Sequence, residues 1–505
     1  MLASHQPAFA GVAISSQQYG SYVILGQSPA GVNIAFARTV IEPNLTCPSV
    51  YNTTSKVPKS MITRDNPGHF SVMVCEAVIE FEQNYQLLFA DVAVDLPVAK
   101  SNISHIQVFG DTGCKTADCA LGLPAQPFKS LADSAITNKP DVVLHMGDFN
   151  YRGTGGKVSF SMKDDKDTLT QQTQYTYDAG DGTGKSAHCG QNAPFYSQAA
   201  DNANRPDTWQ YWHDDLFKSA AKLMAAAPWI VVRGNHELCS RAGPGYFYFL
   251  DPHSNLVTGQ SQLSCPVVDV TQGAMVNTLQ VPNYTVSFDT LDVAVIDSAN
   301  ACDSYTNSSY QAVYKKVFGD LNASVNSNKK DTWLITHRPI WAVEQYNAKT
   351  GTGCSDDNLF GCINQMMQKA IAAQPSKALA KDIKLVLTGH MHKFESVTFA
   401  NASHPPNIIV GSSGVQLYGV APVKPTKVTI NGLTANVLTT NEQVIKQDRA
   451  YAAFGYLNLK LDGKGGWEGQ LVNPPKHLTL ANCSSKLNLA QGVCELASGV
   501  SLPGQ

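Results

Sequence analysis

The chain repeatedly places a compact polar motif directly after a short apolar run, and this pattern most constrains its fold. The apolar runs have the length of buried strands, and helix-like segments separate several of them. Such alternation indicates an α/β core, in which polar side chains that follow the strands gather at one edge of the sheet. The predicted strands are His105–Phe109, Val142–Met146, Trp229–Arg233, Thr332–Ile335, Lys384–Leu387 and Asn407–Val410.

Five of the six motifs contain side chains that bind metal ions in proteins. Carboxylate, phenolate, imidazole and amide oxygen are all metal ligands, and they differ in the ions that they favour. The sixth motif, Val410-Gly411-Ser412-Ser413-Gly414, has no obvious ligand. The candidate ligands are Asp111, Asp148, Tyr151, Asn235, His337, His390 and His392.

Each motif has an ordinary structural interpretation when it is taken alone. Asp111 could cap a helix, His337 could be a loop histidine, and a lone His-x-His pair is more often incidental than a metal site. Five such motifs at successive strand ends are poorly explained in this way. We therefore expect the candidate ligands to converge on one site.

The order of the motifs resembles that of the calcineurin-like metallophosphoesterases and, more narrowly, of the purple acid phosphatases. The resemblance covers about residues 105 to 415 and rests on Asp-x-Gly, Gly-Asp-x-x-Tyr, Gly-Asn-His-Glu, His-x-Pro and Gly-His-x-His. Most of the wider family begins with Asp-x-His, whose histidine is a ligand. This chain has Gly113 at that place and Tyr151 three residues after Asp148, as purple acid phosphatases do.

The resemblance implies a dinuclear centre of Fe(III) and a divalent metal, which would be Zn, Fe or Mn. It further implies hydrolysis of phosphate monoesters by a metal-bound hydroxide, at acid pH. Phenolate and carboxylate suit a hard trivalent ion, whereas imidazole and amide oxygen suit the divalent one. The implied Fe(III) ligands are Asp111, Tyr151, His392 and bridging Asp148, and the implied divalent-metal ligands are Asn235, His337, His390 and the same Asp148.

His236 is the candidate catalytic residue. It adjoins Asn235, and the matching histidine of the family contacts the substrate or its leaving group. We expect Asn235 and His236 to lie at the substrate, with His236 binding phosphate or acting as general acid. The leaving-group acid is otherwise open, because no histidine lies between His337 and His390 and because Lys393-Phe394-Glu395 stands where the family often has tyrosine. The alternatives are His188, Glu344 and Tyr346.

Two other functions compete with a phosphomonoesterase that acts on a small-molecule phosphate ester. One is a phosphodiesterase or nucleotide hydrolase that uses the same site. The other is a surface binding protein in which the metal site is vestigial. The complete ligand set argues against the vestigial site.

The chain of 505 residues is long enough for more than one domain. We predict a small β-rich, sandwich-like domain over 1–100, a metallophosphoesterase α/β/β/α sandwich over 101–475, and a disulfide-pinned tail over 476–505. The polar insertion 152–206 is a possible lid. Helices are expected over Thr208–Ala227, with Asp207 as N-cap, and over Asn358–Ala373. Hairpins are expected around Asn431-Gly432 and between Tyr456 and Leu471.

The charge and the cysteines bear on partners and location. The net charge of −3, without a basic block, argues against nucleic acid, and no apolar run is long enough to span a membrane. Twelve cysteines without a Cys-x-x-Cys pair favour disulfides. We therefore expect a secreted, periplasmic or otherwise extracytoplasmic protein, although no signal peptide is visible. The oligomeric state is not indicated.

The cysteine spacing also predicts pairs. Cys114–Cys119, Cys354–Cys362 and Cys483–Cys494 are close in sequence, Cys47 and Cys75 could join two strands, and Cys189–Cys239 is a further possibility. Eight Asn-x-Ser/Thr sequons are compatible with a glycoprotein. They begin at Asn44, Asn52, Asn102, Asn283, Asn307, Asn322, Asn401 and Asn482.

Overall fold

A computed structural model describes most of the chain. The described residues are 16–115, 119–123, 126–152, 157–163, 169–176, 207–239, 241–265, 280–301, 308–342, 364–400, 404–417, 426–430, 433–440, 454–474, 478–487 and 492–498.

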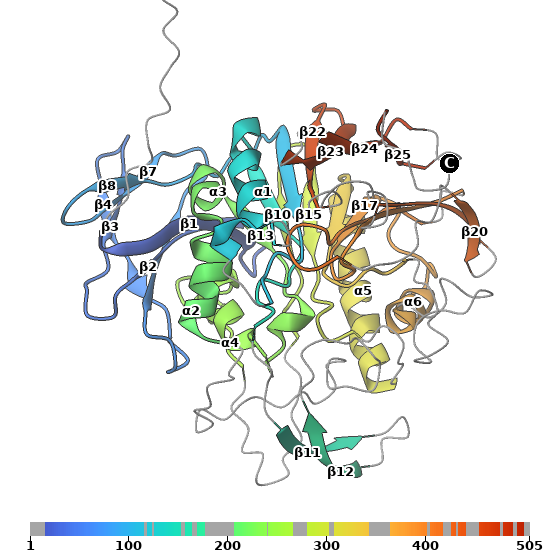
Figure 1. The fold of residues 1–505 in the computed structure, drawn as a ribbon, viewed down its shortest axis with the longest axis horizontal. Coiled ribbons are helices and arrows are strands. Elements are labelled where there is room, and N and C mark those ends of the chain that lie inside the picture. The colour runs from blue at the N-terminus through green and yellow to red at the C-terminus, as the bar shows by residue number, and fades with distance from the viewer. Residues whose placement is uncertain are drawn as a thin grey trace, which may run out of the picture.

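Two large mixed sheets form the middle of the molecule (Figure 1). In the described part of the chain, the first sheet has eleven strands in the order β25-β24-β23-β22-β9-β10-β13-β1-β2-β6-β5. These strands are β1 (Gln18–Gln27), β2 (Asn33–Ile41), β5 (Ile62–Thr63), β6 (Met73–Ile79), β9 (His105–Phe109), β10 (Val142–His145), β13 (Trp229–Val231), β22 (Tyr456–Leu461), β23 (Trp467–Asn473), β24 (Leu478–Ser484) and β25 (Cys494–Leu496).

The second sheet has eight strands among the described residues, in the order β14-β15-β16-β17-β19-β18-β21-β20. They are β14 (Tyr284–Ser287), β15 (Asp292–Val295), β16 (Thr332–Ile335), β17 (Ile383–Thr388), β18 (Phe394–Phe399), β19 (Asn407–Val410), β20 (Thr426–Ile430) and β21 (Leu433–Thr440). The motif-bearing strands run parallel to their neighbours in both sheets, β9-β10-β13 in the first and β16-β17-β19 in the second.

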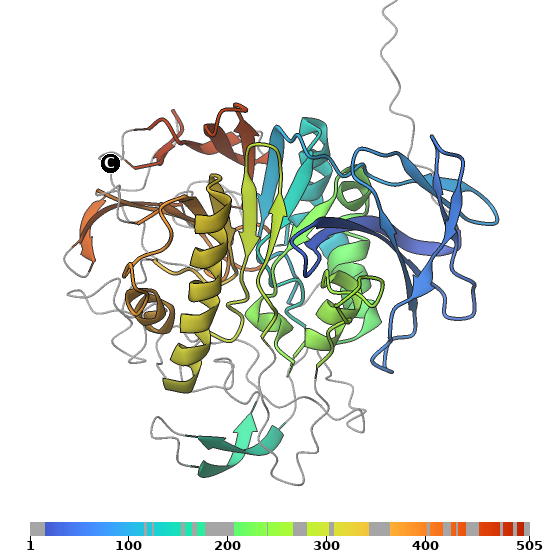
Figure 2. The same cartoon turned by 180° about the vertical axis from the view of Figure 1, so that it is seen from behind.

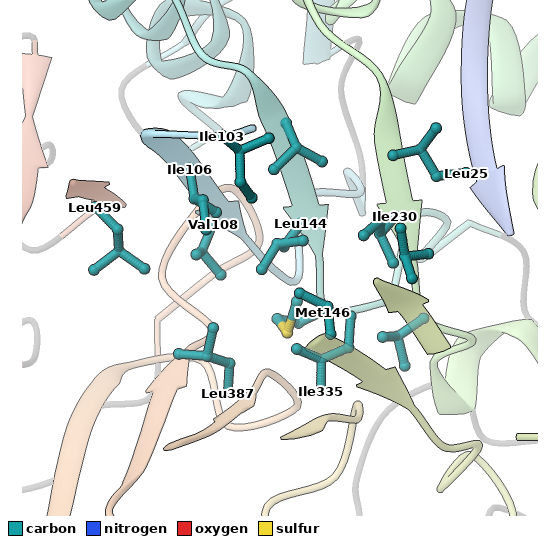
Figure 3. Close-up of a cluster of buried hydrophobic side chains, with 14 of the residues drawn as sticks. Leu25, Ile103, Ile106, Val108, Leu144, Met146, Ile230, Ile335, Leu387 and Leu459 are labelled. Atoms are coloured by element: carbon teal, nitrogen blue, oxygen red, sulfur yellow. The ribbon is translucent and has the colours of Figure 1, made fainter. Parts of the chain in front are cut away.

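The two sheets pack face to face through apolar side chains (Figure 3). Val108, Leu144 and Ile230 of the first sheet share one buried cluster with Ile335 and Leu387 of the second. Since successive strand residues point to opposite faces, the intervening residues face outward and bury against helices. The order is therefore helix, sheet, sheet, helix, and the predicted α/β/β/α sandwich is confirmed.

Helices cover the outer face of each sheet (Figure 1 and Figure 2). Those packed on the first sheet include α1 (Phe128–Ala135), α3 (Ala221–Ala226) and the π-helical turns η3 (His213–Phe217) and η5 (Tyr246–Leu250). The second sheet packs against α5 (Ser308–Asn328) and α6 (Gln365–Ala372). The other described helical segments are η1 (Cys119–Leu121), η2 (Ile136–Asn138), α2 (Trp209–Trp212), η4 (Asn235–Glu237) and α4 (Gly243–Gly245).

The helix predicted over 208–227 is divided into α2, η3 and α3, and its N-cap differs from the prediction. Thr208 is the N-cap, and its Oγ1 accepts a hydrogen bond from Tyr211 N at 3.3 Å. The Asp207 carboxylate instead accepts from Trp212 Nε1 at 2.7 Å and from Gly245 N at 3.0 Å. The prediction of Asp207 as N-cap is wrong because these two donors engage its side chain.

The N-terminal region is β-rich, as predicted, but several of its strands extend the first large sheet. Strand β1 runs parallel to β13, with Ile24 opposite Trp229, and β2, β6 and β5 follow at that edge. A smaller sheet in the order β4-β3-β7-β8 lies beside them (Figure 1). The eleven-stranded sheet therefore runs across residue 100, and the domain limits at 100 and 475 stay predictions. The smaller sheet consists of β3 (Ser49–Asn52), β4 (Pro58–Ser60), β7 (Tyr85–Leu88) and β8 (Ala93–Asp95).

Both predicted C-terminal hairpins are present. Ile430 pairs with Leu433 in β20-β21, and Tyr456 pairs with Val472 in β22-β23. The insertion 152–206 contributes the antiparallel pair β11 (Lys157–Lys163) and β12 (Leu169–Thr176). Its role as a lid stays a prediction.

The described residues contain four disulfides. Cys47–Cys75, Cys114–Cys119 and Cys483–Cys494 are confirmed. Cys239 pairs with Cys265, so the suggested pairing of Cys239 with Cys189 is wrong. Cys189, Cys302, Cys354 and Cys362 lie outside the described residues.

The structure bears on one of the predicted glycosylation sites. The Asn322 side chain is buried, and its amide donates to Ala378 O at 3.1 Å. This sequon is therefore closed to a glycan in the folded chain.

Within the described part of the chain, no helix has both the length and the apolar character that crossing a membrane requires.

Candidate metal centre

The candidate ligands come from the carboxyl ends of strands in both sheets. Asp111 follows β9, Asp148 and Tyr151 follow β10, and Asn235 follows β13 in the first sheet. In the second sheet, His337 follows β16, and the Gly389-His390-Met391-His392 motif follows β17. Because the two sheets pack face to face, these ends meet at one edge of the sandwich.

The backbone turns sharply where three of the ligands leave their strands. Asp111, Asp148 and His390 have φ angles of 58°, 59° and 71°. This left-handed region is unfavourable for residues with a Cβ, and strained backbone of this kind clusters at functional sites. The turns direct the side chains back across the strand ends.

One group of candidate metal ligands surrounds the Tyr151 hydroxyl. Its oxygen lies 2.8 Å from Asp111 Oδ1, 2.9 Å from Asp148 Oδ2 and 3.0 Å from His392 Nε2. The His392 Nε2 atom is also 3.8 Å from Asp111 Oδ1. All four residues are at least 95% buried, because the most exposed of them, His392, is 5% accessible.

A second group lies around the Asn235 side chain. The Asn235 Oδ1 atom is 2.9 Å from His337 Nε2 and 2.8 Å from His390 Nδ1. The His337 Nε2 atom is also 3.3 Å from Asp148 Oδ2. Asp148 therefore belongs to both groups. Asp148, His337 and His390 together could hold one metal ion, since their ligand atoms all lie within 4.8 Å of one another.

Backbone carbonyls fix the orientation of two of the imidazole rings. His337 Nδ1 is 2.6 Å from Met146 O, and His392 Nδ1 is 2.8 Å from Gln416 O. A carbonyl only accepts, so Nδ1 of each histidine carries a proton, and in the neutral ring the lone pair lies on Nε2. In both rings the lone pair thus faces the other candidate ligands, as metal-binding histidines require.

His390 is held differently. Its Nε2 atom is 3.0 Å from Arg338 Nη1, and a guanidinium can only donate. The contact therefore uses the Nε2 lone pair and places the ring proton on Nδ1. Binding an ion through Nδ1 requires Arg338 to release Nε2.

The buried candidate ligands differ in their ionisation. Burial and the neighbouring Asp148 carboxylate raise the pKa of Asp111 well above its usual value, which opposes the carboxylate form that binds a cation. Burial would also raise the pKa of Asp148, but the nearby imidazoles, His337 foremost, hold it well below its usual value. Burial lowers the pKa of His392 to about 3, so its imidazole is neutral and can bind a cation.

These contacts bring many potential ligand atoms together. The Tyr151 hydroxyl lies close to oxygen or nitrogen atoms of three other candidate ligands, and His337 Nε2 lies close to Asp148 Oδ2. Oxygen and nitrogen atoms of these kinds bind metal ions in proteins. Ligand atoms bound to one ion at about 2.1 Å are about 3 Å apart when their bonds are perpendicular, which is close to the spacing seen here. The residues therefore fit a metal centre.

Gly113 explains why this chain does not use an Asp-x-His ligand. A Cβ atom at Gly113 would lie 2.6 Å from Phe149 O and 2.9 Å from Asn150 N. Gly113 N also donates to Asp148 O at 3.3 Å. The loop that carries Tyr151 therefore packs against the bare backbone at Gly113, and a histidine has no room there.

Glu237 holds the Asp148 loop, a role that the sequence analysis did not assign. Its carboxylate accepts from the backbone N–H groups of Asp148, Phe149 and Asn150 at 2.9, 2.8 and 3.2 Å. It also accepts from Gly234 N at 3.0 Å. Burial, together with the Asp148 charge, raises the pKa of Glu237 to about 8. Its position beside Asn235 and His236 in the Gly-Asn-His-Glu motif was the available signal.

The sixth motif is a support for the site, although it carries no ligand. Ser413 Oγ accepts from Gly110 N at 3.3 Å, and Val415 N donates to Asp111 O at 2.8 Å. A Cβ atom at Gly414 would lie 2.5 Å from Thr112 O. The motif therefore packs closely against the Asp111 turn and helps to fix it.

His236 lies against this cluster. Its ring centroid is 3.9 Å from that of Tyr151, and its backbone N–H donates to Asp148 Oδ1 at 2.8 Å. Its Nδ1 atom is 2.6 Å from Arg241 Nη2. The alternative acids His188, Glu344 and Tyr346 lie outside the described residues. Among the described residues, the candidate proton donor His236 thus lies beside the ligands.

A model of the calcineurin-like phosphoesterase family matches residues 105–394, which is more than half of the chain. The chain belongs to the calcineurin-like phosphoesterase family. The matched region runs from β9 to the first residue of β18 and includes all seven candidate ligands. No curated protein is significantly similar to this family member in sequence.

The fold is also similar to that of a purple acid phosphatase isolated from yellow lupin (Lupinus luteus) seeds. The two structures superpose with a TM-score of 0.50 and share 12% sequence identity. The match covers 96% of this chain and 77% of the lupin chain. At this identity the similarity is one of fold, and it includes the β-rich N-terminal region as well as the phosphoesterase core.

Proposed function

We propose that this calcineurin-like phosphoesterase is an acid phosphatase that hydrolyses phosphate monoesters at a dinuclear Fe(III)–divalent metal centre. The observation that carries the proposal is the cluster of buried oxygen and nitrogen atoms around Tyr151 and Asn235, which are potential metal ligands 2.8–3.3 Å apart. A phenolate beside two carboxylates suits a hard trivalent ion. The divalent ion would be Zn, Fe or Mn.

The two groups of side chains divide naturally between two ions. Tyr151, Asp111 and His392 would hold Fe(III), and Asn235, His337 and His390 would hold the divalent metal. Asp148, which contacts both groups, would bridge them. Two carboxylates and one phenolate would leave such a pair of ions with a net positive charge, which attracts a phosphate anion.

When bound, the two ions would supply a hydroxide nucleophile at modest pH and stabilise the charge that develops on the phosphoryl oxygens. The chain itself would place Asn235 and His236 at the substrate. The His236 ring lies against the Tyr151 ring, which is one of the candidate ligands. Glu237 and the Ser413 segment would keep the ligand-bearing turns from moving during turnover.

A location outside the cytoplasm is part of the proposal. Disulfides persist in oxidising compartments, and four are present in the described residues. The substrate would be a small-molecule phosphate ester.

Turnover of p-nitrophenyl phosphate and of bis-p-nitrophenyl phosphate at acid pH tests this function. We expect the monoester to be hydrolysed with the higher kcat/KM, and chelation of the metals to abolish the activity. Preference for the diester would instead assign a phosphodiesterase to the same site. No turnover of either compound by protein with both metals bound would contradict the enzymatic function.

A further inference from the structure

His236 is held by a guanidinium, which is an unusual partner for a residue expected to donate a proton. Arg241 Nη2 lies 2.6 Å from His236 Nδ1, and both side chains are buried. Arginine has five N–H donors and no acceptor, and it stays protonated. The hydrogen bond therefore runs from Arg241 to His236, and Nδ1 of His236 is the acceptor.

This direction determines where the ring proton of His236 lies. If Nδ1 accepts, the single proton of the neutral ring is on Nε2. A protonated Nδ1 would instead direct an N–H group at the guanidinium N–H across 2.6 Å, and two donors cannot bond to each other.

Several contacts hold the backbone on either side of Arg241. Arg241 N donates to Leu238 O at 2.8 Å, and Ala242 N donates to His236 O at 3.1 Å. The disulfide Cys239–Cys265 ties the same segment to a distant part of the chain. A Cβ atom at Gly243 would lie 2.9 Å from Cys265 Sγ, so the turn is closely packed. These contacts fix the backbone from which the Arg241 side chain reaches the His236 ring.

We propose that Arg241 is a positioning residue, and that it orients His236 to donate Nε2–H to a phosphoryl oxygen of the substrate. In this arrangement His236 binds the phosphoryl group and does not protonate the leaving group. The proposal rests on the proposed phosphatase function and chooses between the two roles that the sequence left open for His236. A donor aimed at a phosphoryl oxygen stabilises the charge that develops there in the transition state.

Kinetics with a series of aryl phosphates, from p-nitrophenyl to phenyl phosphate, separate the two roles. Removal of one transition-state donor costs roughly 10²–10³ in rate, so His236→Ala should lower kcat/KM by about this factor for every leaving group. A general acid matters most for poor leaving groups. A loss that grows as the leaving group becomes more basic would overturn the proposal.

Variants of Arg241 test the positioning role. Arg241→Ala should lower kcat/KM by about 10–100-fold, the usual effect of losing a residue that orients a functional one. The double variant with His236→Ala should be no slower than His236→Ala alone, because Arg241 acts through His236. Arg241→Lys should recover most of the activity, since its ammonium can also donate to Nδ1. Fully additive losses, with bound metal retained in each variant, would contradict the role.

A direct readout of the ring proton needs no activity. In metal-free protein labelled with ¹⁵N-histidine, the His236 signals can be assigned by their absence in His236→Ala. We expect Nδ1 to be unprotonated and Nε2 to be protonated, and the preference for that form to weaken in Arg241→Ala. A protonated Nδ1 in the unaltered chain would overturn the inference even if the enzyme were an active phosphatase. Conversely, an unprotonated Nδ1 in a protein without phosphatase activity would leave the Arg241–His236 contact intact and contradict only the proposed function.

Discussion

Replacing Asp148 with asparagine should lower phosphatase activity by at least about a thousandfold. Asp148 contacts a candidate ligand in each of the two groups: its Oδ2 atom lies 2.9 Å from Tyr151 Oη and 3.3 Å from His337 Nε2. Asparagine keeps the shape but loses the charge, so one bridging carboxylate is lost from both metal positions at once. Metal-ion catalysis is worth several kcal/mol of transition-state stabilisation, and each 1.36 kcal/mol is about tenfold in rate.

Asp141→Asn is the matched control for Asp148→Asn. Asp141 immediately precedes β10, at the end opposite to Asp148, and its carboxylate accepts from Ser104 N and His105 N at 2.8 and 3.0 Å. This variant should bind metal and turn over substrate normally, even if it is somewhat less stable. Metal content by elemental analysis and kcat at saturating p-nitrophenyl phosphate measure the difference. Equal metal content and activity in the two variants would exclude Asp148 as a bridging ligand.

Glu76→Ala should destabilise the whole protein by about 3–5 kcal/mol, because it leaves two buried cations without their anion. The Glu76 Oε2 atom lies 3.1 Å from Arg38 Nε and 2.7 Å from Arg64 Nη1, and all three residues are buried. The same guanidiniums donate to backbone carbonyls of Phe247–Asp251, including Phe249 O at 3.0 Å and Tyr248 O at 3.0 Å. The N-terminal strands therefore hold the segment that follows the His236 loop.

Chemical denaturation measures this effect, with Glu80→Ala as the control. Glu80 lies just beyond the end of β6, the strand that carries Glu76, and its side chain is exposed. Surface substitutions of this kind usually change stability by less than about 0.5 kcal/mol.

We also expect a chain that lacks residues 1–100 not to fold, since β1 pairs with β13 in the sheet that supports the site. A stable, active truncated chain would show that the N-terminal region is dispensable.

The sequence predicted those strands and hairpins whose formation depends on residues close together in the chain. The Asn431-Gly432 hairpin and the strands before the five motifs follow from turn residues and apolar runs. The pairing of β1 with β13 could not be predicted in this way, because Ile24 and Trp229 lie far apart in the sequence. Cys239 likewise pairs with Cys265, and only the folded segment shows that this cysteine is near.

The supports of the site were harder to predict than its ligands. Ligands are recognisable by residue type, whereas Glu237 and Ser413 act through backbone N–H groups whose positions depend on the fold. Asp207 shows the same limit, since its capping signal was sound but Trp212 and Gly245 engage its carboxylate instead. The guanidinium beside His236 depends on a closed turn that sequence spacing does not reveal.

The visible spectrum of the iron-loaded protein, before and after Tyr151→Phe, tests the Fe(III)–divalent metal assignment most directly. The Tyr151 oxygen lies among Asp111, Asp148 and His392, so an Fe(III) ion held there would bind its phenolate. Such a phenolate transfers charge to the metal and absorbs visible light. We expect coloured protein that contains one iron and one divalent metal per chain. Tyr151→Phe removes the phenolic oxygen with little change in volume, so the variant should fold normally but lose the visible absorption band. Colourless iron-replete protein, or an unchanged spectrum in Tyr151→Phe, would contradict the Fe(III) site and leave a phosphoesterase with divalent metals only.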